Sequence, residues 1–350
     1  MKITKSEFGK TKDGKVAYLY EITNSKNAKL AVTNYGAIMV NIIVPDKAGE
    51  FVDVLLGYDK LEDYFENPSA HGAVVGRNAN RIEKAQFVLN GEVIKMEVND
   101  NDNNLHSGSD SYFLRLYDEV EVNEAEGSVT FRLLSPDGDQ NLPGNLTFDV
   151  TYKFTEDNEV VINYKAVSDK DTIINPTNHA YFNLNGHNSG CALDHIIWVD
   201  ADKFTVADEH AIPHGEERDV TGTVFDFRTP KSAREGNKST DMQIASASGY
   251  DRNFVLNNPT LDAPIARIEG DKSGRVMEIF TTLPGLQFYA GNFIGLNEES
   301  KDGYIYKGND GLAFESQYAP NAVNLPQFPQ PFFKAGEEYN STTIYKFSAK

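Results

Sequence analysis

Residues 148–166 read FDVTYKFTEDNEVVINYKA, and apolar side chains alternate with polar ones along both halves of this stretch. The alternation runs over residues 148–154 and again over residues 160–166, with the polar residues 156–158 between the two runs. A period of two is typical of a β-strand with one buried face, because successive side chains point to opposite sides of a strand. The stretch therefore predicts two antiparallel strands joined by a tight turn, which is the unit of a β-sandwich or barrel.

Short strand-like runs bounded by turn residues recur through the rest of the chain. They are expected at residues 38–44, 51–56, 85–89, 93–98, 276–282, 286–293, 312–317 and 341–348, with turns at Asp13-Gly14 and Asn90-Gly91. One short helical turn is expected at residues 61–66, and no long amphipathic helices alternate with the strands, which argues against a doubly wound parallel sheet. Without a linker-like stretch or an internal repeat, we expect one all-β domain over residues 1–350 with few short helices.

The composition excludes several classes of function. The formal net charge is −19, so nucleic acid and anionic membrane surfaces would be repelled. Cys191 is the single cysteine, and an internal disulfide is therefore impossible. The first residues, MKITKSEFGK, have no apolar signal core, and we expect a cytoplasmic protein.

Residues 175–184 read NPTNHAYFNL and hold the first candidate for proton transfer. If the stretch is extended, His179 and Tyr181 share one face, while Ala180 and Phe182 face the other way. A histidine titrates near neutral pH and can act as an acid or a base. The alternative is a histidine with satisfied hydrogen bonds and a purely structural role in a β-sheet.

Further polar side chains stand on expected strands and loops. Arg77 and Arg81 lie four residues apart in a loop-like stretch and need not have the same role, and His210 and His214 flank Pro213, which argues against a zinc pair on a helix. Sugars are bound by convergent donors and acceptors with aromatic rings against their apolar faces. The candidate set is Arg81, His106, His179, Asp251, Gln287 and Glu315.

Several motifs occur together in an order that resembles the galactose mutarotase (aldose 1-epimerase) family. They are Gly76-Arg77 through Asn80-Arg81-Ile82, Asn104-Leu105-His106, the stretch 175–184, Gly249-Tyr250-Asp251, residues 286–292 (LQFYAGN) and residues 314–317 (FESQ). These motifs span most of the chain, and the central one is long enough to be specific.

The resemblance implies a large antiparallel β-sandwich with an open sugar-binding cleft, and interconversion of the α and β anomers of a free aldose without cofactor or metal. By residue, it implies His179 as general acid and Glu315 as general base. It also implies that the sugar is held by Asn80, Arg81, His106, Tyr181, Asp251 and Gln287. A monomer or a homodimer would fit.

The chain departs from the family pattern in a few places, and other functions stay open. Arg252 follows Asp251 where a histidine is common, Ser107 replaces a common glycine, and Asn321 replaces a common aspartate, so substrate preference between glucose and galactose is left open. A glycoside hydrolase would use two carboxyl groups, with Asp251 and Glu315 as the candidate pair. A non-catalytic sugar-binding module and an enzyme for hexose 6-phosphates are the remaining alternatives.

Overall fold

Strands are the main secondary structure in the computed structural model, which describes residues 1–295 and 300–350. Every ladder between two labelled strands of this part of the chain is antiparallel. The prediction of an all-β, antiparallel sandwich is therefore confirmed.

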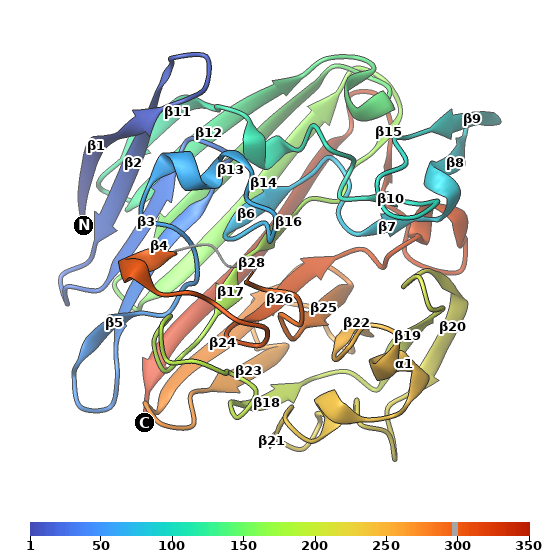
Figure 1. Ribbon diagram of the computed structural model, residues 1–350. Coiled ribbons are helices and arrows are strands. Elements are labelled where there is room, and N and C mark those ends of the chain that lie inside the picture. The colour runs from blue at the N-terminus through green and yellow to red at the C-terminus, as the bar shows by residue number, and fades with distance from the viewer. Residues whose placement is uncertain (296–299) are drawn as a thin grey trace.

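The largest sheet has nine strands, and its long members run side by side across the molecule (Figure 1). In spatial order they are β11 (Asp118–Asn123), β12 (Ser128–Ser135), β13 (Leu146–Phe154), β14 (Glu159–Ser168), β28 (Glu338–Ala349), β24 (Arg275–Thr281), β23 (Ala266–Glu269), β18 (Ile196–Val199) and β21 (Lys231–Ser232). Buried and less buried residues alternate along β13 and β14, as the sequence predicts, because only one face of these strands meets the core.

A second sheet of six strands carries half of the candidate residues. Its order is β17 (Tyr181–Phe182), β26 (Leu312–Gln317), β25 (Gly285–Tyr289), β22 (Asp251–Val255), β19 (Lys203–Ala207) and β20 (Pro213–Asp219). Phe254, Phe288 and Phe314 project from its inner face into the main core. Phe182 meets Tyr345 of β28 with 5.0 Å between ring centroids, so the inner face packs against the nine-stranded sheet.

The N-terminal sheet and four strand pairs complete the β structure. The sheet is β1 (Lys2–Lys10), β2 (Val16–Thr23), β3 (Lys29–Thr33), β4 (Met39–Pro45) and β5 (Phe51–Asp53). The pairs are β6 (Ala73–Val75) with β16 (Thr177–His179), β7 (Arg81–Ile82) with β10 (Asn104–Leu105), β8 (Gln86–Leu89) with β9 (Glu92–Lys95), and β15 (Thr172–Ile173) with β27 (Phe332–Phe333).

Helical structure is short throughout the described residues, as expected. It comprises α1 (Met242–Ala245) and the 3₁₀ turns η1 (Leu61–Phe65), η2 (Glu83–Ala85), η3 (Tyr112–Leu114), η4 (Asp139–Asn141), η5 (Gly236–Lys238), η6 (Lys301–Gly303) and η7 (Ala322–Asn324). Within those residues, no helix is long and apolar enough to cross a membrane.

Some expected strand boundaries were wrong, because contacts with distant segments of the chain set them. The strand expected over residues 51–56 ends at Asp53, because the following backbone turns to another partner and Leu56 N donates to Tyr181 O at 3.0 Å. The loop-like stretch 71–83 contains β6 and β7, which are short because each pairs with a single partner strand. His214 lies within β20 rather than in a loop.

Candidate active site

One cleft brings together seven of the eight candidate residues. Its volume is about 280 Å³, at the lower end for small-molecule sites. The lining residues are Pro68, Ser69, Ala70, Asn80, Arg81, Leu105, His106, His179, Tyr181, Asp251, Tyr289, Phe293 and Glu315. Gln287 lines instead a small adjoining cavity of about 10 Å³, which shares Asn80 and Asp251 with the cleft.

The outer face of the six-stranded sheet forms the floor of the cleft. Asp251 of β22 stands opposite Tyr289 of β25, and Tyr181 of β17 lies in the same row of the sheet. In the next row, Gln287 stands opposite Glu315. Because side chains of a strand alternate between faces, these residues all point away from the phenylalanines of the core.

The stretch 175–184 forms two short strands that place His179 and Tyr181 in the cleft. Thr177 Oγ1 donates to Ser316 O at 2.9 Å, which ties β16 to β26 and so brings His179 beside Glu315. Ala180 and Phe182 are buried in the main core, as the alternation predicts. The His179 and Tyr181 rings are in contact, with centroids 4.9 Å apart.

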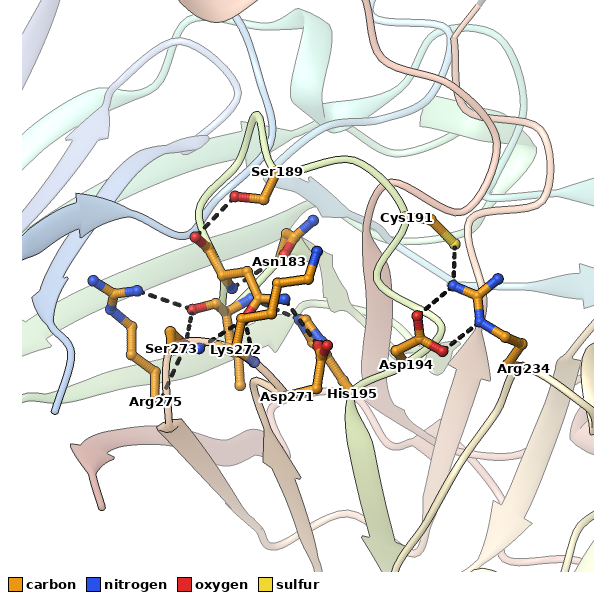
Figure 2. A network of polar contacts seen from close by, with 12 residues as sticks. Asn183, Ser189, Cys191, Asp194, His195, Arg234, Asp271, Lys272, Ser273 and Arg275 are labelled. Carbon is orange, nitrogen blue, oxygen red and sulfur yellow. Dashed lines mark hydrogen bonds and ion pairs between the residues drawn. The ribbon is translucent and has the colours of Figure 1, made fainter.

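Behind this stretch, a polar network holds its C-terminal end (Figure 2). Asn183 Nδ2 donates to Gly190 O at 2.7 Å and to Asp310 O at 2.9 Å. His195 is fully buried, and its Nε2 accepts from Leu184 N at 2.9 Å. The backbone that follows Tyr181 is therefore fixed by side chains from outside the cleft.

His179 and Glu315 form a buried acid–base pair. Nε2 of His179 lies 3.6 Å from Oε1 of Glu315, and their side chains are 9% and 3% exposed. Oε2 of Glu315 and Nδ1 of His179 have no hydrogen-bond partner among the described residues. A buried polar atom without a partner is costly, so the carboxylate is arranged to accept a hydrogen bond from a ligand.

Burial moves the pKa values of this pair apart. It lowers the pKa of His179 to about 4, although the charge of Asp251 opposes this shift. It raises the pKa of Glu315 well above its usual range, and the charge of Asp251 adds to this shift while Arg81 opposes it. Both shifts have the same physical cause, because burial favours the uncharged imidazole and the protonated carboxyl group.

His106 is a neutral hydrogen-bond donor at the edge of the cleft. Burial lowers its pKa well below the usual value, and His179 and Arg81 add to this effect. Its Nδ1 accepts from Asn80 N at 3.1 Å, so Nε2 carries the hydrogen. The ring stands edge-on to that of His179, with centroids 5.6 Å apart.

The two arginines of the stretch 71–83 have different environments. Arg77 is 1% exposed and donates to backbone carbonyls and hydroxyl groups of the scaffold, among them Pro143 O at 2.8 Å and Ser135 Oγ at 2.7 Å. Arg81 lines the cleft, and its Nε donates to Asp100 Oδ2 at 2.7 Å. The structure thus separates a structural arginine from one that a ligand can contact.

Comparison with known proteins identifies the family. The family model for aldose 1-epimerase matches residues 18–346. The chain belongs to the aldose 1-epimerase family. The galactose mutarotase of Sus scrofa is 38% identical over 99% of this chain and 98% of its own length. The aldose 1-epimerase of Escherichia coli (strain K12) is 35% identical over 97% of each chain.

A solved structure supports the same assignment. The galactose 1-epimerase of Lactobacillus acidophilus NCFM superposes with a TM-score of 0.88 at 29% identity, over 100% of this chain and 99% of that one. This protein is therefore an aldose 1-epimerase, an enzyme of the isomerase class. Its cleft is the candidate active site.

Three features of this aldose 1-epimerase were missed at the sequence level. Tyr289 and the 64% exposed Phe293 line the cleft, and Gln317 lies fully buried beside Gln287. Tyr289 shares the strand face of Gln287, as the period of two predicts, and Gln317 shares that of Glu315, but neither residue stands in the candidate set. Phe293 would fall on the same face of the strand expected over residues 286–293, but β25 ends at Tyr289, so the alternation does not extend to it.

Arg252 contacts the backbone of Asp251 rather than its carboxylate. The guanidinium donates to Asp251 O at 2.6 Å and to Gln243 Oε1 of α1 at 2.9 Å. The carboxylate of Asp251 accepts from Gln287 Nε2 at 2.6 Å. Arg252 therefore connects β22 with α1, and Gln287 orients the acidic group.

His210 and His214 lie outside the cleft. His214 Nε2 is 3.0 Å from Asp208 Oδ2, and His210 is exposed. Within residues 1–295 and 300–350, no group of three or more His, Cys, Asp or Glu side chains is placed to hold a metal ion.

Proposed function

We propose that this enzyme interconverts the α and β anomers of free aldohexoses, with D-galactose and D-glucose as substrates. His179 gives a proton to the ring oxygen, and Glu315 removes the proton of the anomeric hydroxyl. The bond between C1 and the ring oxygen breaks, and an open-chain aldehyde results. After rotation about C1–C2, the hydroxyl attacks the other face of the aldehyde while both protons are returned, so the enzyme ends in its starting state.

The observation that carries this proposal is the contact between His179 and Glu315 in a cleft. Both oxygens that exchange protons are bonded to C1, so the acid and the base must converge on one carbon. A separation of 3.6 Å between Nε2 and Oε1 meets that demand, and Oε2 of Glu315 has no partner of its own among the described residues. A hydrogen bond from the anomeric hydroxyl to this carboxylate favours its ionised form and shifts its proton to His179.

The remaining polar groups of the cleft suit the hydroxyls of a neutral sugar. We assign this role to Asn80, Arg81, His106, Tyr181, Asp251 and Gln287. Tyr289 and Phe293 supply aromatic surface for the apolar face of the ring. A glycoside hydrolase or a non-catalytic sugar-binding protein is not favoured, because the relatives are epimerases and Glu315 is paired with an imidazole at 3.6 Å.

The proposal also covers the pathway, the location and the assembly of the enzyme. It comprises a place in hexose or galactose metabolism, a cytoplasmic location, and a monomer or homodimer without nucleic-acid or membrane partners. The net charge of −19 supports the last two exclusions.

Polarimetry on freshly dissolved α-D-galactose and α-D-glucose tests the proposal. Wild type should speed the approach to equilibrium rotation, and Glu315→Gln and His179→Asn should each lower kcat by about 10³-fold, the usual scale for general acid–base catalysis. Glu216→Gln and His210→Asn are matched controls on exposed residues and should keep full activity. Near-normal turnover in either cleft variant would remove that residue from its role, and an inactive wild type would refute the substrates.

A further inference from the structure

Four polar side chains beside the cleft are linked head to tail by hydrogen bonds. Arg81 N donates to Asn80 Oδ1 at 2.9 Å, and Asn80 Nδ2 donates to Gln317 Oε1 at 3.4 Å. Gln317 Nε2 donates to Gln287 Oε1 at 3.1 Å, and Gln287 Nε2 donates to Asp251 Oδ1 at 2.6 Å. Gln317 is the middle link, and it lies outside the lining of both cavities.

At each end of this series, the direction of the hydrogen bond is fixed by the partner. A backbone N–H can only donate, so Asn80 must turn its oxygen toward Arg81 and its nitrogen toward Gln317. A carboxylate can only accept, so Gln287 must turn its nitrogen toward Asp251. Gln317 satisfies both requirements at once, because its oxygen faces Asn80 and its nitrogen faces Gln287.

A further hydrogen bond, to Asn253, prevents the side-chain amide of Gln317 from flipping. Its Nε2 donates to Asn253 Oδ1 at 3.2 Å, and Asn253 Nδ2 donates to Thr205 Oγ1 at 3.0 Å. With 0% exposure, Gln317 cannot exchange these partners for solvent. Gly285 stands opposite Gln317 on β25, and a Cβ there would lie 2.5 Å from Asn253 Oδ1, so the missing side chain leaves room for the junction.

We propose that Gln317 is a positioning residue that holds Asn80 and Gln287 in the orientations that Arg81 N and Asp251 require, and so maintains the atoms that the two amides present to the sugar. With Gln317 in place, both residues offer N–H groups next to the carboxylate of Asp251. A hydroxyl can then accept from an amide nitrogen and donate to Asp251. If Gln287 turned over, its oxygen would face the carboxylate and this part of the site would present acceptors alone. The inference rests on the proposed sugar-binding roles of Asn80, Gln287 and Asp251.

The first test is Gln317→Met, which keeps the length of the side chain and removes its hydrogen bonds. We expect KM for the free aldose to rise by about tenfold or more, because hydroxyl contacts lose their alignment. We expect kcat to change by less than about threefold, because His179 and Glu315 make no hydrogen bond to Gln317. Loss of kcat with an unchanged KM would overturn the proposal.

A double-mutant cycle separates positioning from general destabilisation. If Gln317 acts through Gln287, adding Gln317→Met to Gln287→Met should raise KM much less than it does in wild type. Fully additive effects would contradict the proposal. The control is Asn34→Leu, another buried amide, which accepts from Tyr18 N at 2.7 Å and is not part of the cleft lining. It should lower the urea midpoint and leave KM unchanged.

The outcomes also separate this inference from the proposed function. An inactive wild type would refute the substrates before Gln317 is tested. An active wild type with an unchanged KM in Gln317→Met would refute the positioning role alone. If Gln317→Met does not fold, Gly285→Ala serves instead: it displaces Asn253 Oδ1 from its contact with Gln317, and we expect a smaller rise in KM with kcat maintained. No rise in KM would overturn the proposal.

Discussion

At the scale of single residues, neighbouring charges tune the acid–base pair. Asp251 lies in the same cleft as His179 and Glu315, and its negative charge raises the pKa of both groups. Burial acts on them in opposite directions, since it penalises the cation of one and the anion of the other. One carboxylate can therefore shift the working pH range of the pair and contact the substrate as well.

Asp251→Asn should move the whole pH profile of kcat/KM toward lower pH. Without the charge of Asp251, the pKa values of His179 and Glu315 both fall, so the acid limb and the alkaline limb move in the same direction. KM should rise too, because the amide has no charge and only one acceptor oxygen in place of two. Measurements of kcat/KM across the pH range would check this, with the exposed Asp202→Asn as control. An alkaline limb that stays in place would contradict the electrostatic explanation.

Substitution by methionine should affect stability at Arg77 and KM at Arg81. Arg77→Met leaves several buried scaffold acceptors without a donor and should lower the free energy of unfolding by about 3 kcal/mol or more, with KM unchanged. Arg81→Met should raise KM, while its partly exposed ion pair with Asp100 contributes less than about 1 kcal/mol to stability. Urea unfolding and polarimetry on both variants separate the two roles. Equal loss of stability in both would contradict them.

At the scale of elements, the side chains of the active site stand on short strands. Polar contacts from neighbouring segments stabilise these strands, which are too short to be held by their own ladders. The strand β17 has two residues, and the chain after it depends on the network around His195 (Figure 2). Nε2 of His195 accepts from Leu184 N, so its Nδ1 carries the hydrogen and donates to Asp271 Oδ1 at 3.1 Å. This bond holds the pKa of Asp271 well below its usual range, with Asn185 as a further donor.

Asp271 should make the fold sensitive to acid. Because its pKa is depressed in the folded state, the carboxylate contributes stability above its unfolded pKa of about 3.9 and loses it as pH falls toward the folded value. The free energy of unfolding of wild type should fall below about pH 4 more steeply than that of Asp271→Asn, by up to about 1.4 kcal/mol per pH unit. Urea titrations at several pH values measure both slopes. Equal slopes would show that Asp271 carries no such linkage.

At the scale of the whole molecule, two sheets face each other across an apolar core, and the active face looks outward. The nine-stranded sheet supports the six-stranded sheet through aromatic contacts such as that between Phe182 and Tyr345. The net charge of −19 creates a negative field that a neutral sugar does not feel at long range.

The rate with neutral aldoses should therefore be insensitive to salt. We expect kcat/KM for D-galactose to stay constant when NaCl rises from about 0.05 to about 0.5 M, since screening changes only interactions between charges. Any activity on hexose 6-phosphates should be lower at low salt and rise with screening. A higher rate with the phosphorylated sugar at low salt would contradict the neutral-substrate proposal and favour a phosphosugar enzyme.

Much of the fold and of the site follows from the sequence alone. The alternation over residues 148–166 predicts β13 and β14, and the same period of two places His179 with Tyr181 and sets Glu315 opposite the phenylalanine face of β26. These inferences succeed because the direction of a side chain on a strand depends only on the local backbone. Boundaries such as the end of β5 at Asp53 escaped prediction because they depend on a distant partner strand.

Only the tertiary structure decides which side chains come together in the active site. The register between β25 and β26 sets Gln287 opposite Glu315, and the bond from Thr177 to Ser316 brings His179 to that pair. The sequence by itself determined the long strands such as β13 and β14, the faces of their side chains and the motifs of the family. Which arginine supports the scaffold, and how Gln317 joins Asn80 to Gln287, depend on segments far apart in the chain. Such contacts form only when separate strands pair and sheets pack, which no local pattern encodes.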